Sequence, residues 1–151
     1  MNFRRLFVPL ALVIAIPLLA ACGGDAEPTP TPSGPLPTLV DVEVSEWAVT
    51  QVINQSGSGT TTFHVTNKGA LEHEFVLFRT DLGPTELPIG ADGTVDESAG
   101  EVIGEIQPSE LQPGDQAATT FQLGSGKYVL LCNLPGHYAQ GMRSAFALAN
   151  N

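Results

Sequence analysis

The residues most able to do chemistry lie near the C-terminus, where a thiol, an imidazole and a thioether follow one another closely. Cys132, His137 and Met142 are separated by four residues in each interval. Together they form a soft, mixed ligand set, and a second imidazole would complete the set that a mononuclear redox copper ion prefers. The pattern therefore predicts a metal site whose second histidine comes from elsewhere in the chain.

The sequence around these side chains indicates how they are brought together. An apolar run over residues 128–131 leads into Cys132 and predicts a buried strand that delivers the thiol to its end. Pro135-Gly136 then predicts a loop, so that His137 and Met142 can fold back toward the sulfur.

Two further histidines are candidates for the missing ligand. A strand expected over residues 72–79 places His73 on the same face as Phe75 and Leu77, toward the core. A lone buried histidine would be a packing residue by default, but the need for a second imidazole favours His73 as a ligand. His64 alternates with threonines on the solvent side of another expected strand, so we expect a surface residue there.

The motif Cys132-x4-His137-x4-Met142, with Pro-Gly before the histidine, resembles the ligand loop of cupredoxins, the small blue (type 1) copper proteins. Residues 67–77, around His73, are similar to the first-histidine segment of that family. The resemblance covers the chain from residue 39 to the C-terminus. It implies a Greek-key, two-sheet β-sandwich with one copper ion, Cu(I) or Cu(II), bound by these four side chains.

The same resemblance implies a role for each group. Cys132 would carry most of the electronic coupling and the colour, and Met142 would tune the potential. The electron port would be His137 with its apolar surround, which the family pattern places at Leu134, Pro135 and Tyr138. None of these groups would act as an acid, a base or a nucleophile, so we do not expect an enzyme.

One residue departs from the family pattern. Many cupredoxins have Asn directly after the first histidine, where it braces the ligand loop, whereas this chain has Glu74. Because contacts around the ligands tune a metal, this brace needs to be located in the structure.

The elements that must position these residues read as strands. Short alternating segments bounded by glycine-rich or proline-rich turns predict an all-β sandwich, and no helix pattern or internal repeat is present. Trp47 is expected to anchor the core. The expected strands include residues 40–45, 60–66, 72–79, a segment ending near Phe121, residues 128–131 and residues 143–149.

Residues 80–110 are the exception, because they contain eight acidic residues, no basic residue and several prolines and glycines. Only residues 102–106 resemble a strand. A connection this long is often functional or mobile, so the segment is either a docking site for a basic partner or a solvated loop. Its acids lack the spacing of a calcium loop, and no calcium is expected.

The N-terminal quarter of the chain predicts export. Residues 1–21 have a basic start and an apolar run typical of a signal peptide. Leu19-Ala20-Ala21-Cys22 resembles a bacterial lipobox, which implies a lipid on Cys22; the alternative is an uncleaved signal anchor. Residues 22–38 form a Pro/Thr-rich linker that favours extended polyproline II structure. Residues 39–151 suit one domain.

Charge and cysteine content limit the partners. Removing residues 1–21 removes two arginines and no acid, which leaves four basic and sixteen acidic residues and a formal charge of −12. Nucleic acid is therefore excluded as an expected partner. The acidic surface either attracts a basic protein partner or is simply solvated; for an electron carrier, the partner would be a redox protein such as a cytochrome or a respiratory or photosynthetic complex. With Cys22 assigned to lipid, Cys132 has no disulfide partner, which leaves a free buried thiol, an intermolecular bridge or a metal. The neighbouring His137 and Met142 favour a metal, and we expect a monomer.

Three functions remain open from the sequence. The first is a membrane-tethered carrier of single electrons that faces the periplasm or the cell exterior. The second is a copper chaperone or buffer, which a Met-rich or His-rich tract would favour, and the chain has no such tract. The third is a metal-free adhesion module, which would leave the Cys/His/Met spacing as coincidence.

Overall fold

The computed structural model describes residues 36–55 and 60–149. The expected signal peptide (1–21), Cys22 and most of the linker lie outside the described residues. In the part of the chain that is described, none of the helices has the length and apolar character needed to cross a membrane.

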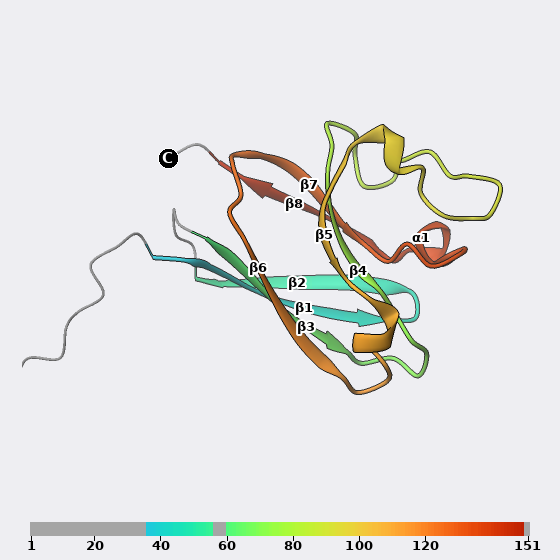
Figure 1. Cartoon of the computed structure of the whole chain (residues 1–151), viewed down its shortest axis with the longest axis horizontal. Helices are drawn as coiled ribbons and strands as arrows, with labels where there is room; N and C mark the ends of the chain where they lie inside the picture. The colour runs from blue at the N-terminus through green and yellow to red at the C-terminus, as the bar shows by residue number, and fades with distance from the viewer. Residues whose placement is uncertain (1–35, 56–59, 150–151) are drawn as a thin grey trace, which may run out of the picture. The chain divides into compact units, whose positions relative to one another are not determined.

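Within residues 36–55 and 60–149, eight strands form two four-stranded sheets, with the orders β2-β1-β3-β6 and β5-β4-β7-β8 (Figure 1). The chain passes between the sheets from β3 to β4, from β5 to β6 and from β6 to β7, as expected for a Greek-key sandwich. This confirms the all-β fold. The strands are β1 (Thr38–Ser45), β2 (Ala48–Gln55), β3 (Thr61–Asn67), β4 (Phe75–Arg79), β5 (Glu101–Ile106), β6 (Gln116–Phe121), β7 (Gly126–Leu131) and β8 (Arg143–Leu148).

The first sheet follows the alternation in the sequence. β1 pairs antiparallel with β2 and parallel with β3. Val40, Val42 and Val44 of β1 are buried between the sheets, whereas Asp41 and Glu43 are exposed. Because successive side chains of a strand point to opposite faces, this period of two fixes the inner face of the sheet.

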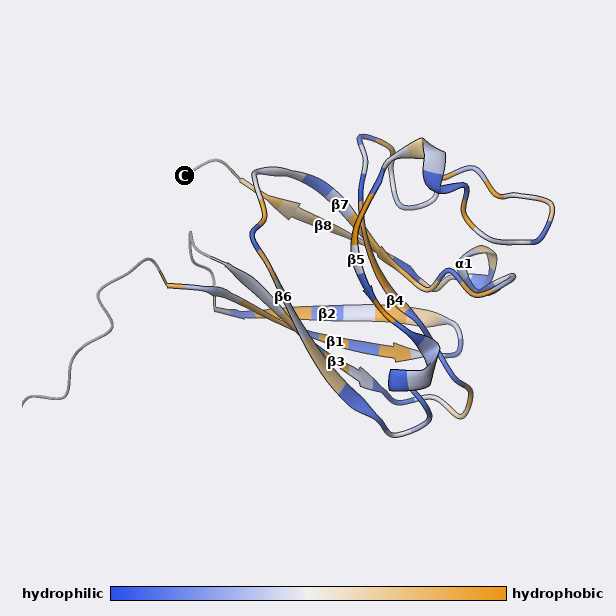
Figure 2. Ribbon diagram, viewed as in Figure 1, coloured by the Kyte–Doolittle hydropathy of each residue, from blue (hydrophilic) through white to orange (hydrophobic). Residues whose placement is uncertain are grey.

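Two strands of the second sheet, β4 and β7, are buried on both faces. In β4, Phe75 and Leu77 pack in the main core, whereas Val76 and Phe78 belong to a second cluster on the other face. Figure 2 shows the hydrophobic character that runs along β4. A strand covered on both faces reads as a continuous apolar run rather than an alternating one, as residues 128–131 of β7 also do.

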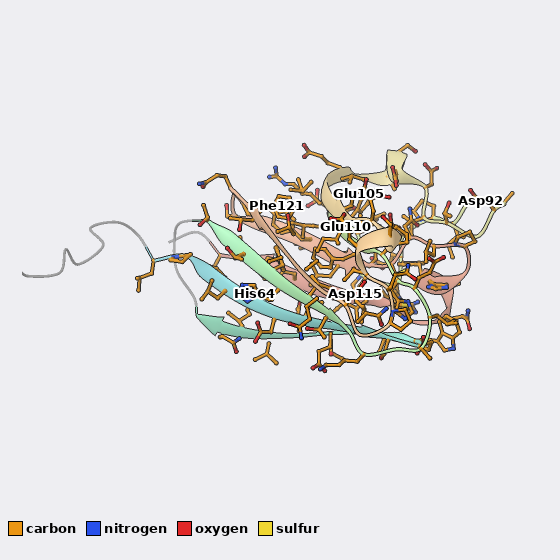
Figure 3. All side chains as sticks on the ribbon, turned by 60° about the horizontal axis from the view of Figure 1, so that its bottom comes forward. His64, Asp92, Glu105, Glu110, Asp115 and Phe121 are labelled. Carbon is orange, nitrogen blue, oxygen red and sulfur yellow. The ribbon has the colours of Figure 1, made fainter. Side chains whose placement is uncertain are left out.

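Residues 80–110 supply the cover for the outer face of this sheet. Leu87 and Val95 are buried against β4 and β7, and Ile89 forms a β-bridge with Val95. The segment also contains β5 and two short 3-10 helices, η1 (Glu97–Ala99) and η2 (Pro108–Glu110). Its acidic residues stay exposed, among them Asp92, Glu105 and Glu110 (Figure 3). The segment therefore packs on the sheet through Leu87 and Val95, for which the solvated-loop interpretation is wrong, whereas Leu82 and Ile89 are exposed, as its acidic residues are.

Two expectations about the first half of the domain need correction. The strand expected over residues 72–79 begins only at Phe75, so His73 lies in the connection from β3. Trp47 is not a core anchor, because it occupies the turn between β1 and β2 and its surface is 38% exposed. A turn at the end of a sheet carries its side chains beyond the interior, which is why the strand pattern misplaced Trp47.

Candidate metal centre

The loop that follows β7 is closed by its own backbone. The Cys132 amide donates to the Met142 carbonyl (3.1 Å), and the Met142 amide donates to the His137 carbonyl (3.2 Å). Gly136 has a φ of 82°, which favours glycine, and it directly precedes the single-turn helix α1 (His137–Gln140). These contacts bring the ends of the predicted ligand motif together at the end of β7.

His73 reaches the same end of the sandwich from the β3–β4 connection. Its amide donates to the Leu111 carbonyl (3.2 Å). The buried Asn67 holds this connection, because its side-chain amide nitrogen donates to the carbonyls of Leu71 and Leu111 (2.8 Å each). The Gly69 amide in turn donates to the Asn67 side-chain oxygen (2.8 Å).

The three strongest sequence candidates meet in space. One ligand atom from each of His73, Cys132 and His137 lies within 4.8 Å of the others. The distance from Cys132 Sγ to His137 Nδ1 is 3.4 Å. His73 and Cys132 are fully buried, and His137 is half-buried. His64 lies elsewhere, exposed on β3 and 3.3 Å from Asp41 (Figure 3), as the sequence predicted.

The buried His73 ring tests whether a metal ion fits. Neither of its nitrogens has a hydrogen-bond partner among the described residues. Nε2 lies 3.3 Å from Glu46 Oε1, a close charge contact without hydrogen-bond alignment. That contact leaves Nδ1 as the nitrogen available to Cys132 and His137. Because an unpaired buried polar atom is costly, a cation among these three ligands fits what the ring lacks.

The protonation states of the cluster also suit a metal ion. Burial lowers the pKa of His73, although the charge of Glu46 opposes this. Burial, and next the nearby His73, lower the pKa of His137. Both imidazoles are therefore neutral at neutral pH, the form that binds metals. Burial raises the pKa of the Cys132 thiol, so a cation would have to displace its proton.

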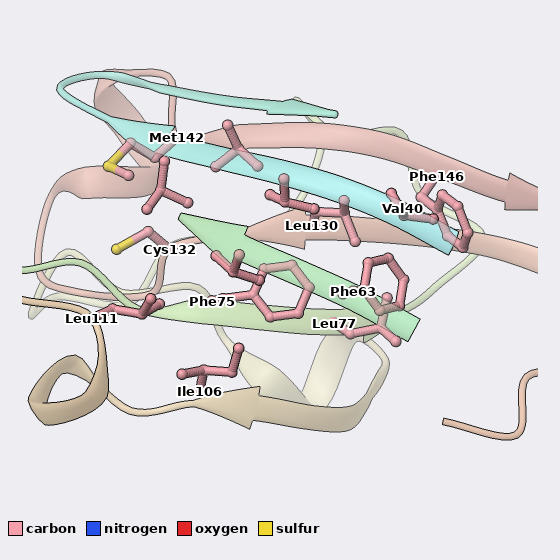
Figure 4. Packing of buried hydrophobic residues seen from close by; sticks show 14 of the residues in the cluster. Val40, Phe63, Phe75, Leu77, Ile106, Leu111, Leu130, Cys132, Met142 and Phe146 are labelled. Atoms are coloured by element: carbon pink, nitrogen blue, oxygen red, sulfur yellow. The ribbon is translucent and has the colours of Figure 1, made fainter. Parts of the chain in front are cut away.

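Met142 lies in the same region but has a different status. It is fully buried, directly precedes β8 and belongs to the core cluster that contains Cys132. Figure 4 shows the sulfur atoms of Met142 and Cys132 at the same end of that cluster. This position is compatible with a weak axial ligand, and that role of Met142 stays a prediction.

Glu74 joins the two ligand segments. Its amide donates to Cys132 Sγ (3.2 Å), and its carboxylate Oε2 accepts from the Asn133 amide (3.2 Å). The brace that the sequence left in doubt is therefore present, with a carboxylate as the acceptor.

The segment 80–110 supports the ligand loop from outside. The Val95 amide donates to the Asn133 side-chain oxygen (2.6 Å), and the Gly136 amide donates to the Gly93 carbonyl (2.9 Å). Sequence reasoning missed this support, because no local pattern links two segments forty residues apart.

Tyr138 has a different place from the one expected. It is only 2% exposed, and its hydroxyl donates to the Pro84 carbonyl (2.8 Å) and accepts from the Leu87 amide (3.1 Å). The side chain therefore anchors the covering segment and is not part of an exposed surround of His137. That expectation was wrong, whereas Leu134 and Pro135 do lie beside His137.

The exposed surround of His137 includes residues from outside the ligand loop. The Trp47 ring lies edge-on to the His137 ring, with centroids 5.1 Å apart. An open pocket of about 300 Å³ is lined by Leu71, Glu72, Leu134, Pro135 and His137. Trp47 and Leu71 carry no sequence signal for this role, because each lies in a separate turn of the chain.

Glu74 predicts a pH effect on the metal-free protein. Burial, and next the charge of Glu105, raise the pKa of its carboxyl. The folded chain then holds this proton more tightly than the unfolded chain, so Glu74 stabilises the fold below the ordinary carboxyl pKa. That contribution is lost as pH rises through the raised value. Relative to wild type, Glu74→Gln should therefore gain free energy of unfolding as pH rises, measured by urea denaturation.

Glu72→Gln is the matched control, because Glu72 is the exposed residue on the other side of His73. Over the same pH range, Glu74→Gln should gain more free energy of unfolding than Glu72→Gln. An equal drift in both variants would assign the effect to net charge and refute the role of Glu74.

Comparison with solved structures finds the same fold in auracyanins. The auracyanin of Roseiflexus castenholzii is 23% identical, with 74% of this chain and 96% of that chain covered and a TM-score of 0.51. Auracyanin B is 19% identical, with 80% and 94% covered and a TM-score of 0.51. Auracyanin A of Chloroflexus aurantiacus is 19% identical, with 75% and 99% covered and a TM-score of 0.49.

Among curated protein sequences, none matches this chain. The family model described as the sulfocyanin (SoxE) domain matches residues 51–151, more than half of the chain. That range contains the whole candidate site and six of the eight strands in full. The resemblance to cupredoxins is thereby confirmed, and the chain belongs to the sulfocyanin family of blue copper cupredoxins.

Proposed function

We propose that this protein is a mononuclear type 1 copper carrier that passes single electrons between redox partners while tethered to a membrane. The observation that carries the proposal is the cluster of His73, Cys132 and His137, in which a buried imidazole lacks a partner beside a buried thiol. Copper bound there would supply a one-electron couple. Thiolate and imidazole ligands suit both of its oxidation states.

The supports of the ligands favour an electron carrier over a chaperone or buffer. His73 is fully buried, and backbone hydrogen bonds close the loop that contains Cys132 and His137. A site held in this way needs little rearrangement when one electron arrives or leaves. Release of the metal, which a chaperone requires, would need the chain to open around His73.

The half-buried His137 offers an electron port. Trp47, Leu71, Leu134 and Pro135 surround it with apolar surface, and two of these, Trp47 and Leu71, are 38% and 48% exposed. A partner that packs on this surface would come close to a ligand of the metal. In this surface, Trp47 and Leu71 take the place expected for Tyr138, because Tyr138 packs against residues 80–110.

The charge around this port favours a basic partner. Glu72 lines the pocket beside His137, and Glu97 accepts from the side chain of Asn133 (3.2 Å), next to Cys132. Asp92 is exposed and precedes Gly93, which contacts the ligand loop. Opposite charge accelerates encounter, so we propose a cytochrome or a respiratory or photosynthetic complex with a basic docking surface.

Residues 1–38 favour export and attachment to a membrane. A lipid on Cys22 would hold the protein on a membrane, on the side that faces the periplasm or the cell exterior. Residues 25–38, the proline-rich part of the linker, would span roughly 40 Å at about 3.1 Å per residue and so hold the domain clear of the membrane.

Addition of Cu(II) to the metal-free protein tests the function. We expect one copper ion per chain, an intense visible thiolate-to-copper band and reversible one-electron reduction. Electron exchange with a cationic cytochrome should slow as salt is added, whereas exchange with an anionic one should not. Colourless binding, or rapid loss of copper to a competing chelator, would refute the carrier and favour a buffer.

A further inference from the structure

The turn between β1 and β2 touches both candidate histidine ligands. Glu46 Oε1 lies 3.3 Å from His73 Nε2. The next residue, Trp47, places its ring centroid 5.1 Å from that of His137, at an interplanar angle of 78°. Two consecutive residues of one tight turn therefore contact the two imidazoles, and neither residue belongs to the ligand motif.

The Glu46 carboxylate is itself fixed in place. Its Oε1 accepts hydrogen bonds from the amides of Ala70 (2.9 Å) and Leu71 (2.7 Å), which lie just before His73. Its side chain is only 25% exposed. These two backbone amides hold the Glu46 carboxylate in place beside the His73 ring.

Glycines let the chain approach the turn on both sides. A Cβ atom at Gly69 would lie 2.6 Å from the oxygens of the Glu46 carboxylate. A Cβ atom at Gly141 would lie 2.7 Å from the Trp47 carbonyl oxygen, and Gly141 has a φ of 128°. The Trp47 backbone excludes a side chain at Gly141, whereas a side chain at Gly69 would displace the Glu46 carboxylate from its position.

We propose that Glu46 and Trp47 are positioning residues for the two histidines. The charge of Glu46, 3.3 Å from Nε2, favours the form of His73 with its proton on Nε2, so that Nδ1 faces the metal, and it favours Cu(II) over Cu(I). Trp47 restrains the exposed side of His137. This inference rests on the proposed function, because it assumes a metal at these ligands.

The contact between Glu46 and His73 should change both the copper affinity and the reduction potential. Removing a group that orients a ligand typically costs 10-fold to 100-fold in metal affinity. Glu46→Gln keeps the shape and an acceptor oxygen but removes the charge, so Cu(II) should be weakened more than Cu(I). A tenfold difference between the two affinities corresponds to a rise of about 59 mV in reduction potential.

The test compares the reduction potentials of copper-loaded wild type, Glu46→Gln and Glu43→Gln. Glu43 is exposed three residues earlier on β1, and its replacement removes the same charge without a contact to either histidine. We expect a higher potential in Glu46→Gln and a much smaller change in Glu43→Gln. Equal shifts in the two variants would overturn the proposal, because they would reflect net charge alone.

Two measurements on wild type avoid any risk that a variant misfolds. In the metal-free protein, nitrogen NMR of the histidines should find the His73 proton on Nε2; a proton on Nδ1 would overturn the role of Glu46. Trp47 is the only tryptophan, so copper loading should quench the fluorescence strongly. Unchanged fluorescence on loading would overturn the contact between Trp47 and the His137 ligand.

Failure of this inference is distinguishable from failure of the proposed function. If wild type takes up no copper or stays colourless, the metal site itself is refuted. If wild type becomes blue while the potential of Glu46→Gln matches that of wild type, the site stands and the positioning role is refuted.

Discussion

Replacing Cys132 with serine is expected to abolish the visible band of the copper-loaded protein completely. The thiolate is the ligand that would transfer charge to the metal, and a serine oxygen is a harder donor that suits copper poorly. Cys132 is fully buried beside both histidines, and it is the free thiol of the described chain. Visible absorption with copper in excess, together with equilibrium dialysis, measures the loss of colour and of binding.

His64→Ala is the control for a general effect of changing copper-binding residues. His64 is exposed on β3, and its side chain contacts Asp41. This variant should keep both the colour and one copper ion per chain. If His64→Ala removed the band while His73→Ala kept it, the assignment of the ligands would be wrong.

The cluster of His73, Cys132 and His137 could be predicted in part because two of its members lie close in the sequence. A buried strand that ends at Cys132, followed by Pro-Gly, predicts a loop that brings His137 back toward the thiol. His73 was predicted from its place on the core-facing side of the expected strand, from the need for a second imidazole and from the resemblance of residues 67–77 to the first-histidine segment of cupredoxins. The expected strand around His73 was too long, but its burial was correct.

Residues around the ligands were less predictable, because their direction depends on tertiary contacts. Tyr138 follows His137 in a single helical turn, where adjacent side chains point about 100° apart. The His137 side chain therefore remains half-buried at the site, whereas the Tyr138 side chain enters the second cluster. Trp47 is apolar and adjoins a strand, but the turn that carries it ends at His137 rather than in the core.

The contacts of residues 80–110 could not be predicted from the sequence, for a related reason. Composition shows that the segment is rich in acidic residues and has no basic residue, but the acidic residues are exposed and say nothing about its packing. Two of its buried residues, Leu87 and Val95, are isolated among prolines and glycines, so no periodicity reveals them. Leu87 and Val95 cover the outer face of β4 and β7. The continuous apolar runs of those two strands indicate that this face is covered, but they do not indicate which residues cover it.

Asn67 carries a large predicted effect on stability, because one buried side chain ties three segments together. It is 1% exposed at the end of β3. Its amide nitrogen donates to Leu71 before His73 and to Leu111 after η2, while its oxygen accepts from Gly69. Removing a partner from a buried polar group costs about 1–3 kcal/mol. The Leu111 carbonyl keeps its bond from the His73 amide, which limits the total loss.

Asn67→Ala should therefore lower the free energy of unfolding of the metal-free protein by about 2–3 kcal/mol, measured by urea denaturation. Asn54→Ala is the matched control, because Asn54 is exposed on β2, where substitutions usually change stability by less than about 0.5 kcal/mol. Asn67→Ala should also loosen the segment that contains His73. Hydrogen exchange of the backbone amides of residues 69–73 should therefore accelerate in Asn67→Ala and stay unchanged in Asn54→Ala. A loss of stability without faster exchange there would show that Asn67 supports the sandwich but does not hold the histidine segment.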